Sequence, residues 1–227
     1  AIGSIATQQA KGTQATMKAI THLLNYCATH PDAVVRYHAS DMKLNVHSDA
    51  SYLSAPKARS RVGGYHTLGS EPTNGAINVL CSIMREVVAS ASEAELAALY
   101  HNGKEVCPLR IALIELGHPQ PATTIITDNS TAAGIANDTV KQKRSKAIDM
   151  RFYWIRDRVR QGQFVIYWKK GILNRADYFT KHHAPAHHQA IRSAYLHEPT
   201  ATSNYFDCLQ ENDDDPAPKS VTFAPDV

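Results

Sequence analysis

The first periodic pattern along the chain is that of a helix. Hydrophobic side chains at Met17, Ile20, Leu24 and Cys27 are spaced by three, four and three positions, which places them on one face of an amphipathic helix. Residues 1–13 are mostly small and polar and follow no such period. The spacing therefore predicts a helix over about 15–27.

A β-rich stretch follows this helix. Residues 44–49 alternate between apolar and polar side chains, and the runs 61–68 and 77–83 are rich in strand-forming residues. A short β-branched stretch at 34–38 precedes them. These runs predict an antiparallel meander of about three strands.

From Ser90 onward helices alternate with short strands. Ser92 is the expected N-cap of the first helix, and Gly103 and Pro108 are expected to interrupt it before a second helical stripe at 106–116. The later elements are predicted as a strand at 123–127, helices at 132–136 and 148–159, a strand at 164–168 and a helix at 185–195. This order gives a mixed sheet with helices on its faces.

Composition narrows the class of protein. Hydrophobic residues make up 43% and charged residues 20%, which excludes collagen-like, coiled-coil and wholly disordered chains. The four cysteines form no CxxC pair, which excludes a zinc ribbon and argues against a disulfide framework. The chain contains neither an apolar run of membrane-spanning length nor a signal sequence. We therefore expect no membrane partner and no secretion, with the protein in the cytoplasm or nucleus.

Four acidic residues fall at the predicted ends of elements. Asp49 and Asp128 end strands, Glu95 lies in the first turn of a helix, and Asp177 opens the last helix. A mixed sheet can bring such positions to one edge, and clustered carboxylates bind hard divalent cations. Spacing alone leaves open that these are four of 21 acidic residues on a solvated surface.

Five short sequence words add a resemblance to a known family. In chain order they are HSDAS at 47–51, SASEAEL at 90–96, TDNS at 127–130, RSKAIDMR at 144–151 and NRADYFTK at 174–181. The set resembles the ribonuclease H domain of copia-type long-terminal-repeat retrotransposon Pol polyproteins, over roughly residues 15–197.

The resemblance implies an α/β fold, namely a ribonuclease H-like mixed five-stranded sheet with helices on both faces. It implies a Mg²⁺-dependent endonuclease that cuts the RNA strand of RNA–DNA hybrids, using two ions for which Mn²⁺ can substitute. The residues it assigns to catalysis and to the metal are Asp49, Glu95, Asp128 and Asp177. Glu95 is preferred to Glu93 because it directly precedes Leu96, as in the family's pattern.

The resemblance also divides the chain. Residues 1–40, with a helix and a strand, resemble the end of a reverse transcriptase region, 41–197 form the ribonuclease H-like domain, and 198–227 are an expected disordered acidic, proline-containing tail. The polymerase's Tyr-x-Asp-Asp word is absent, so the chain is not expected to synthesise DNA. The expected partners are an RNA–DNA hybrid and the reverse transcriptase portion of the same polyprotein, in a virus-like particle or the nucleus.

A basic segment at 141–160 carries a net charge of +6, from eight Lys and Arg against two Asp. Its charges suit a phosphate backbone, although a solvated helix face would look the same. The residues predicted to contact nucleic acid are Lys143, Arg144, Lys146, Asn129 and Ser130.

Two alternatives stay open at this point. His183 and His187 are spaced for zinc on a helix, but no acid or cysteine nearby completes such a site. The chain is alternatively an inactive or domesticated retroelement fragment that only binds nucleic acid or protein partners. The presence of all four acids argues against a decayed site.

Overall fold

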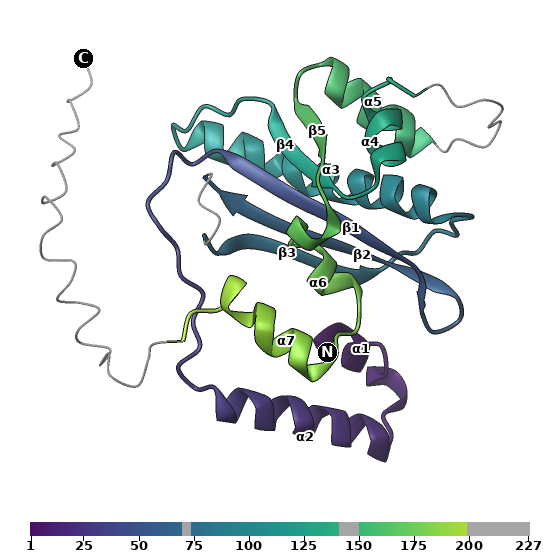
Figure 1. The fold of residues 1–227 in the computed structure, drawn as a ribbon, viewed down its shortest axis with the longest axis vertical. Helices are drawn as coiled ribbons and strands as arrows, with labels where there is room; N and C mark the ends of the chain where they lie inside the picture. Colours follow the sequence, from purple (N-terminus) through teal and green to yellow (C-terminus); the bar gives the residue numbers. More distant parts are fainter. Residues whose placement is uncertain (70–73, 141–149, 199–227) are drawn as a thin grey trace, which may run out of the picture.

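The structure of the protein is a computed structural model, which describes residues 1–69, 74–140 and 150–198. Its centre is a five-stranded sheet in the order β3-β2-β1-β4-β5 (Figure 1). The strands are β1 (Leu44–Ala55), β2 (Arg59–Leu68), β3 (Ala76–Ile83), β4 (Thr123–Thr127) and β5 (Phe164–Trp168). Strands β3, β2 and β1 are antiparallel, whereas β1, β4 and β5 are parallel. The predicted mixed sheet is confirmed, and the last two strands have the predicted bounds.

Helices cover both faces of the sheet, as predicted (Figure 1). On one face lie α3 (Ala91–Glu115), α4 (Ser130–Ala136) and α5 (Met150–Arg160). On the other lie α6 (Asp177–Thr180) and α7 (Pro185–Ile191), with α1 (Ile2–Ala6) and α2 (Gln14–Thr29) beside them. Short 3-10 turns at Gln9–Lys11, Gly171–Leu173 and Arg192–Ala194 complete the elements.

The strand β1 is longer than predicted. Its parallel pairing with β4 covers only 45–47, but its antiparallel pairing with β2 continues through Ala50 and Ser51. Asp49 therefore lies inside the strand rather than at its end, opposite Gly63 of β2. Because the pairing with β4 has stopped two residues earlier, Asp49 still lies at the edge where β4 ends.

The helix α3 corrects the predicted interruption. It runs unbroken through Gly103 and Pro108, and its N-cap is Ser90 rather than Ser92. The Ser90 hydroxyl accepts a hydrogen bond from the backbone N–H of Glu93 at 3.1 Å. A Cβ at Gly103 would lie 3.0 Å from Ile155 and 3.1 Å from Phe164. This glycine therefore serves close packing against α5 and β5, which a local pattern does not show.

The N-terminal region also differs from the prediction. The helix over 15–27 is confirmed as α2, whose first turn is closed by a capping box at Thr13. The expected strand at 34–38 is absent, since the only β-type contact of these residues is a bridge from Val34 to His197. Residues 1–13 were expected to lack periodic structure, but they contain α1 and a 3-10 turn.

The hydrophobic core lies between the sheet and α3, α4 and α5. Its largest fully buried side chains include Leu99, Ile125, Ile155 and Phe164. Across the described residues, no helix has both the length and the apolar character that a membrane crossing needs. Most of the predicted tail, 199–227, lies outside the described residues, while Glu198 lies 2.8 Å from Nδ1 of His30 and forms an ion pair with Arg192. The division at residue 40 stays a prediction.

Candidate metal centre

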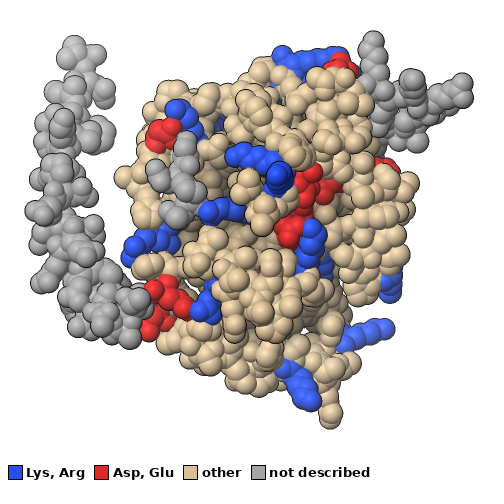
Figure 2. All heavy atoms as spheres, in the orientation of Figure 1, with Lys and Arg blue, Asp and Glu red and all other residues tan. Residues whose placement is uncertain are grey.

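Three carboxylates from separate elements converge at one edge of the sheet. Asp49 comes from β1, Glu95 from α3, and Asp128 directly follows β4. One oxygen of each lies within 4.8 Å of the other two. Asp49 and Glu95 are almost completely buried, at 1% and 6% exposure. Figure 2 shows acidic atoms grouped near the middle of one face, with basic side chains beside them.

The backbone hydrogen bonds of β1 fix the position of Glu95. Its Oε1 accepts the backbone N–H of Ala50 at 3.0 Å, and its Oε2 accepts the hydroxyl of Thr127 at 3.3 Å. The carboxylate thus links β1 to the end of β4. The alternative residue, Glu93, accepts the backbone N–H of Ala89 at the start of α3. The structure therefore brings Glu95, and not Glu93, to the cluster.

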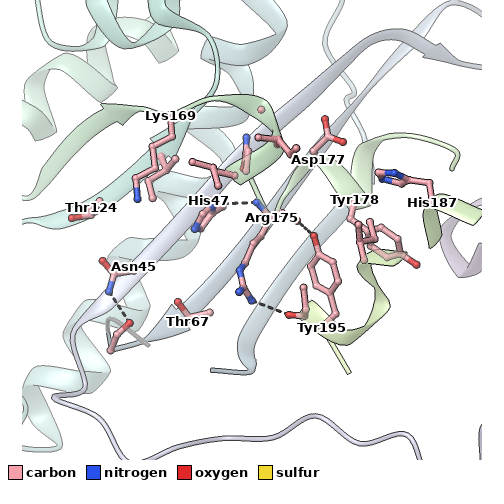
Figure 3. A pocket seen from close by; sticks show the side chains of 18 residues that line it. Asn45, His47, Thr67, Thr124, Lys169, Arg175, Asp177, Tyr178, His187 and Tyr195 are labelled. Atoms are coloured by element: carbon pink, nitrogen blue, oxygen red, sulfur yellow. Dashed lines mark hydrogen bonds between the residues drawn. The ribbon is translucent and has the colours of Figure 1, made fainter. Parts of the chain in front are cut away.

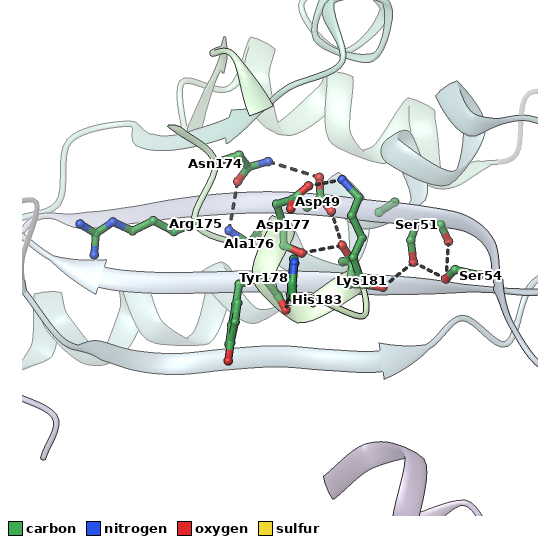
Figure 4. Close-up of polar contacts among 12 residues, drawn as sticks. Asp49, Ser51, Ser54, Asn174, Arg175, Ala176, Asp177, Tyr178, Lys181 and His183 are labelled. Atoms are coloured by element: carbon green, nitrogen blue, oxygen red, sulfur yellow. Dashed lines mark hydrogen bonds and ion pairs between the residues drawn. The ribbon is translucent and has the colours of Figure 1, made fainter. Parts of the chain in front are cut away.

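Asp177 lies beside the cluster but does not complete it. Its carboxylate is paired with Lys181, one turn further along the chain (Figure 4). Burial is the main reason that the pKa values of Asp49 and Asp128 are raised, and the negative charge of Asp177 raises both further. The structure thus brings three of the four predicted acids within mutual ligating distance and places the fourth next to them, neutralised by a lysine.

Two supporting residues were given no role by the sequence analysis. The hydroxyl of Thr180 donates a hydrogen bond to Oδ2 of Asp49. The side-chain amide of Asn174, which is buried, donates to the carbonyl oxygen of Ser48 at 2.9 Å and to Oδ1 of Asp49 at 3.5 Å. Both belong to the word at 174–181, in which only Asp177 was assigned a function. The polar positions flanking the acid were the signal that could have found them.

Burial and mutual repulsion make the cluster hold protons. Burial raises the pKa of Asp49 to about 7, against an opposing hydrogen bond from Thr180. Burial, and then the charges of Asp49 and Asp128, raise the pKa of Glu95 to about 9. Buried carboxylate oxygens that repel one another are the donor set that a hard divalent cation binds, because the cation removes the repulsion. The residues present therefore fit such an ion.

We expect the metal-free protein to lose stability as pH rises from about 4.5 to about 9, between the ordinary pKa values of these carboxyls and their values in the folded protein. Asp49 and Glu95 have higher pKa values folded than unfolded, so the folded state binds more protons, and deprotonation favours unfolding. The slope is up to about 1.4 kcal/mol per pH unit for each carboxyl, and it ends near pH 7 for Asp49 and near pH 9 for Glu95. Denaturant unfolding in chelator measures it. The variant Glu95→Gln should flatten the profile, and equal slopes in both proteins would contradict the shifted pKa values.

The glycine opposite Asp49 allows α6 to approach the sheet. A Cβ on Gly63 would lie 2.6 Å from the Thr180 side chain and 2.8 Å from the carbonyl oxygen of Ala176. We therefore expect Gly63→Ala to cost about 1–3 kcal/mol of unfolding free energy. It should also reduce the stabilisation by Mg²⁺, because Thr180 orients Asp49. Gly12→Ala, where a Cβ meets nothing within 4 Å, is the control. Equal denaturation midpoints for the two variants would show that α6 is not held this closely.

The predicted nucleic-acid contacts are only partly placed. Asn129 is the N-cap of α4, where its Oδ1 accepts the backbone N–H of Ala132 at 2.9 Å, and Ser130 is the first residue of that helix. Both directly follow Asp128. Lys143, Arg144 and Lys146 lie outside the described residues.

Part of the basic segment is neutralised within the protein. In α5, Arg156 and Arg160 both form ion pairs with Asp138. These two arginines therefore have a structural partner, which the sequence analysis did not foresee.

The histidine cluster is organised by aromatic contacts. The rings of His183 and His187 stack at 4.7 Å. His188 shares hydrogen bonds with the hydroxyls of Tyr178 and Tyr26, and so connects α7 to α2. Among the described residues, the only group of three or more metal-ligating side chains is the one formed by Asp49, Glu95 and Asp128.

Comparison with known proteins shows sequence similarity to a retroelement polyprotein. It is 28% identical over 164 residues to the Retrovirus-related Pol polyprotein from transposon TNT 1-94 of Nicotiana tabacum, a match that covers 72% of this chain. The chain resembles a retrotransposon Pol polyprotein. The predicted resemblance is thus confirmed, although the match spans only 12% of the length of that polyprotein. No family model matches the chain.

The similarity to solved structures is lower in sequence identity. A ribonuclease H1 isolated from compost is 16% identical, with 61% of this chain and 93% of that chain covered and a TM-score of 0.47. The ribonuclease H domain of prototype foamy virus is 17% identical, with 63% and 91% covered and a TM-score of 0.41. At this level of similarity they bear on neither the site nor the activity, and the architecture is established by the strand order of this chain.

Proposed function

We propose that this chain is a metal-dependent endonuclease that cuts the RNA strand of RNA–DNA hybrids, as the ribonuclease H part of a copia-type Pol polyprotein. The observation that carries the proposal is the convergence of Asp49, Glu95 and Asp128 within 4.8 Å at one edge of the sheet. The similarity to a Pol polyprotein supports it.

Asp49, Glu95 and Asp128 would hold Mg²⁺, with Asp177 alongside. When bound, divalent cations activate water and stabilise the charge that develops in phosphodiester hydrolysis. The proposed partner is the reverse transcriptase portion of the same polyprotein. The proposed location is a cytoplasmic virus-like particle or the nucleus.

The chain's own residues prepare this site. Thr180 and Asn174 hold the Asp49 carboxylate in one orientation. Ala50 and Thr127 do the same for Glu95. Lys181 neutralises Asp177, which lowers the negative charge that the site must bear without a cation. Fixed carboxylates lose little entropy when a cation binds, so this arrangement is preorganised.

Proposed contacts to the substrate lie beside the cluster. Asn129 and Ser130 adjoin Asp128 at the start of α4, where they would meet the nucleic-acid backbone. Lys143, Arg144 and Lys146 would add electrostatic attraction that does not depend on sequence.

The test is a cleavage assay with four labelled substrates: RNA–DNA hybrid, double-stranded RNA, double-stranded DNA and single-stranded RNA. We expect cleavage of the RNA in the hybrid alone, with Mg²⁺ or Mn²⁺ present and none in chelator. Binding of the hybrid without cleavage, at saturating Mg²⁺ or Mn²⁺, would support the fragment that only binds nucleic acid. Cleavage in excess chelator would contradict the metal dependence.

A further inference from the structure

A second feature lies beside the acidic cluster, on the sheet face that α6 and α7 cover. It is a cavity of about 570 Å³ between β1, β4 and the segment from Lys169 to Tyr195 (Figure 3). Its volume is within the range of small-ligand sites. Gly171 and Asp177 form the part of its wall nearest the cluster, since a Cβ on Gly171 would lie 2.8 Å from Oδ2 of Asp128.

The charges that line this cavity are mainly positive. Lys169 and Arg175 both face it, and neither forms an ion pair with any carboxylate in the described part of the chain. Among the described residues that line the cavity, Asp177 is the one acidic residue, and it is paired with Lys181 outside the lining. A cavity with two uncompensated cations favours an anionic ligand.

Two of the polar side chains that line the cavity, His47 and Arg175, have hydrogen bonds that leave donors available. The backbone N–H of Arg175 donates to Nδ1 of His47 at 3.1 Å. In the neutral ring this bond leaves the proton on Nε2, which can donate a hydrogen bond. The guanidinium of Arg175 donates one hydrogen bond to the carbonyl oxygen of Ala194, at 2.8 Å. This hydrogen bond fixes the orientation of its other N–H donors. Thr67 and Thr124 add hydroxyl groups to the lining.

We propose that this cavity binds a phosphate group through Lys169, Arg175 and the Nε2–H of His47. A phosphate offers several strong acceptors to these converging donors, and a guanidinium with two free N–H groups matches its geometry. The phosphate comes either from the backbone of a bound nucleic-acid strand or from free phosphate or a mononucleotide. Binding of a phosphate from the nucleic-acid backbone rests on the proposed function, because the cavity opens beside Asp128. Binding of free phosphate does not rest on the proposed function.

The first arm of the test uses inorganic phosphate and the metal-free protein in chelator, with chloride holding the ionic strength constant. Binding is followed by NMR through the Arg175 backbone amide and the His47 ring. We expect saturable binding that Lys169→Met and Arg175→Gln each weaken by roughly tenfold, the effect of one charge-assisted contact. The matched control is Lys170→Met, an exposed neighbour that does not line the cavity. It should change the affinity by less than about twofold.

The second arm distinguishes the two sources. An RNA–DNA hybrid with single phosphates replaced in turn by uncharged methylphosphonates is bound in chelator, so that cleavage plays no part. If the backbone is the source, one replacement weakens binding by the wild type and has no effect on Lys169→Met. If free phosphate is the source, inorganic phosphate still binds, but no methylphosphonate replacement weakens binding of the hybrid in this Lys169-dependent way.

Two results would overturn the proposal. One is the absence of both saturable phosphate binding and a Lys169-dependent methylphosphonate position. The other is an equal loss of affinity in Lys170→Met and Lys169→Met, which would show attraction to the surface charge in general. A protein that fails to bind the hybrid at all would refute the proposed function, while the inorganic phosphate arm would still decide the cavity.

Discussion

Asp128→Asn is expected to reduce hybrid cleavage by about a hundredfold or more, because asparagine keeps the shape of the side chain but not the charge that holds a cation. Asp128 is one of the three carboxylates within 4.8 Å. Burial raises the pKa of Glu95 and of Asp49, and the charge of Asp128 adds to both shifts. Removing this charge relieves repulsion, so the metal-free variant should be as stable as the wild type or more stable.

Thermal melts with and without Mg²⁺ complete this test. Ligand binding stabilises the folded state by mass action, so the wild type should gain melting temperature on adding Mg²⁺ and Asp128→Asn should gain less. Asp32→Asn, the same change at an exposed position away from the cluster, is the control for both assays. A variant at position 128 that cleaves at the wild-type rate, or gains as much stability, would remove Asp128 from the site.

Asn102→Ala is expected to cause the largest loss of stability, about 3 kcal/mol or more. Asn102 is fully buried in α3. Its amide donates to Ser48 Oγ and to the carbonyl oxygen of Gly63, both at 3.0 Å, and its Oδ1 is 2.8 Å from Nε2 of His66. Alanine would leave these buried groups without partners. The melting temperature should fall by roughly 10 °C.

A double variant separates the hydrogen bonds from the volume of the side chain. In Asn102→Leu with His66→Phe, both partners of one buried bond become apolar, so the combined loss should be smaller than the sum of the single losses. Additive losses would show that Asn102 and His66 are not energetically coupled. A loss below about 1 kcal/mol in Asn102→Ala would show that this network contributes little to stability.

The sequence predicted the sheet well because its strands carry local signals. The short apolar runs at 123–127 and 164–168 have the bounds of β4 and β5, and the three meander strands are present. The continuity of α3 was not predictable in the same way. It depends on contacts of Gly103 with α5 and β5, which are distant in sequence. The expected strand at 34–38 did not form, because these residues pair with no strand in the described part of the chain and make only an isolated bridge from Val34 to His197.

The candidate site was predicted in composition but not in detail. The word resemblance selected the three acids that the structure brings together, and element order explains why they meet. The pairing of Asp177 with Lys181 depends on the side chains of one short helix, and a motif does not give their orientation. Likewise, the hydrogen bond between Arg175 and His47 joins residues far apart in sequence, so only the fold shows it.

The most direct test of the account is a crystal structure of the protein soaked in Mn²⁺, with the ion located by anomalous scattering. The account predicts an anomalous peak bound by the carboxylates of Asp49, Glu95 and Asp128, and its loss in Asp128→Asn. Absence of a peak between these side chains, in wild-type protein that cleaves hybrid under the same Mn²⁺ concentration, would contradict it.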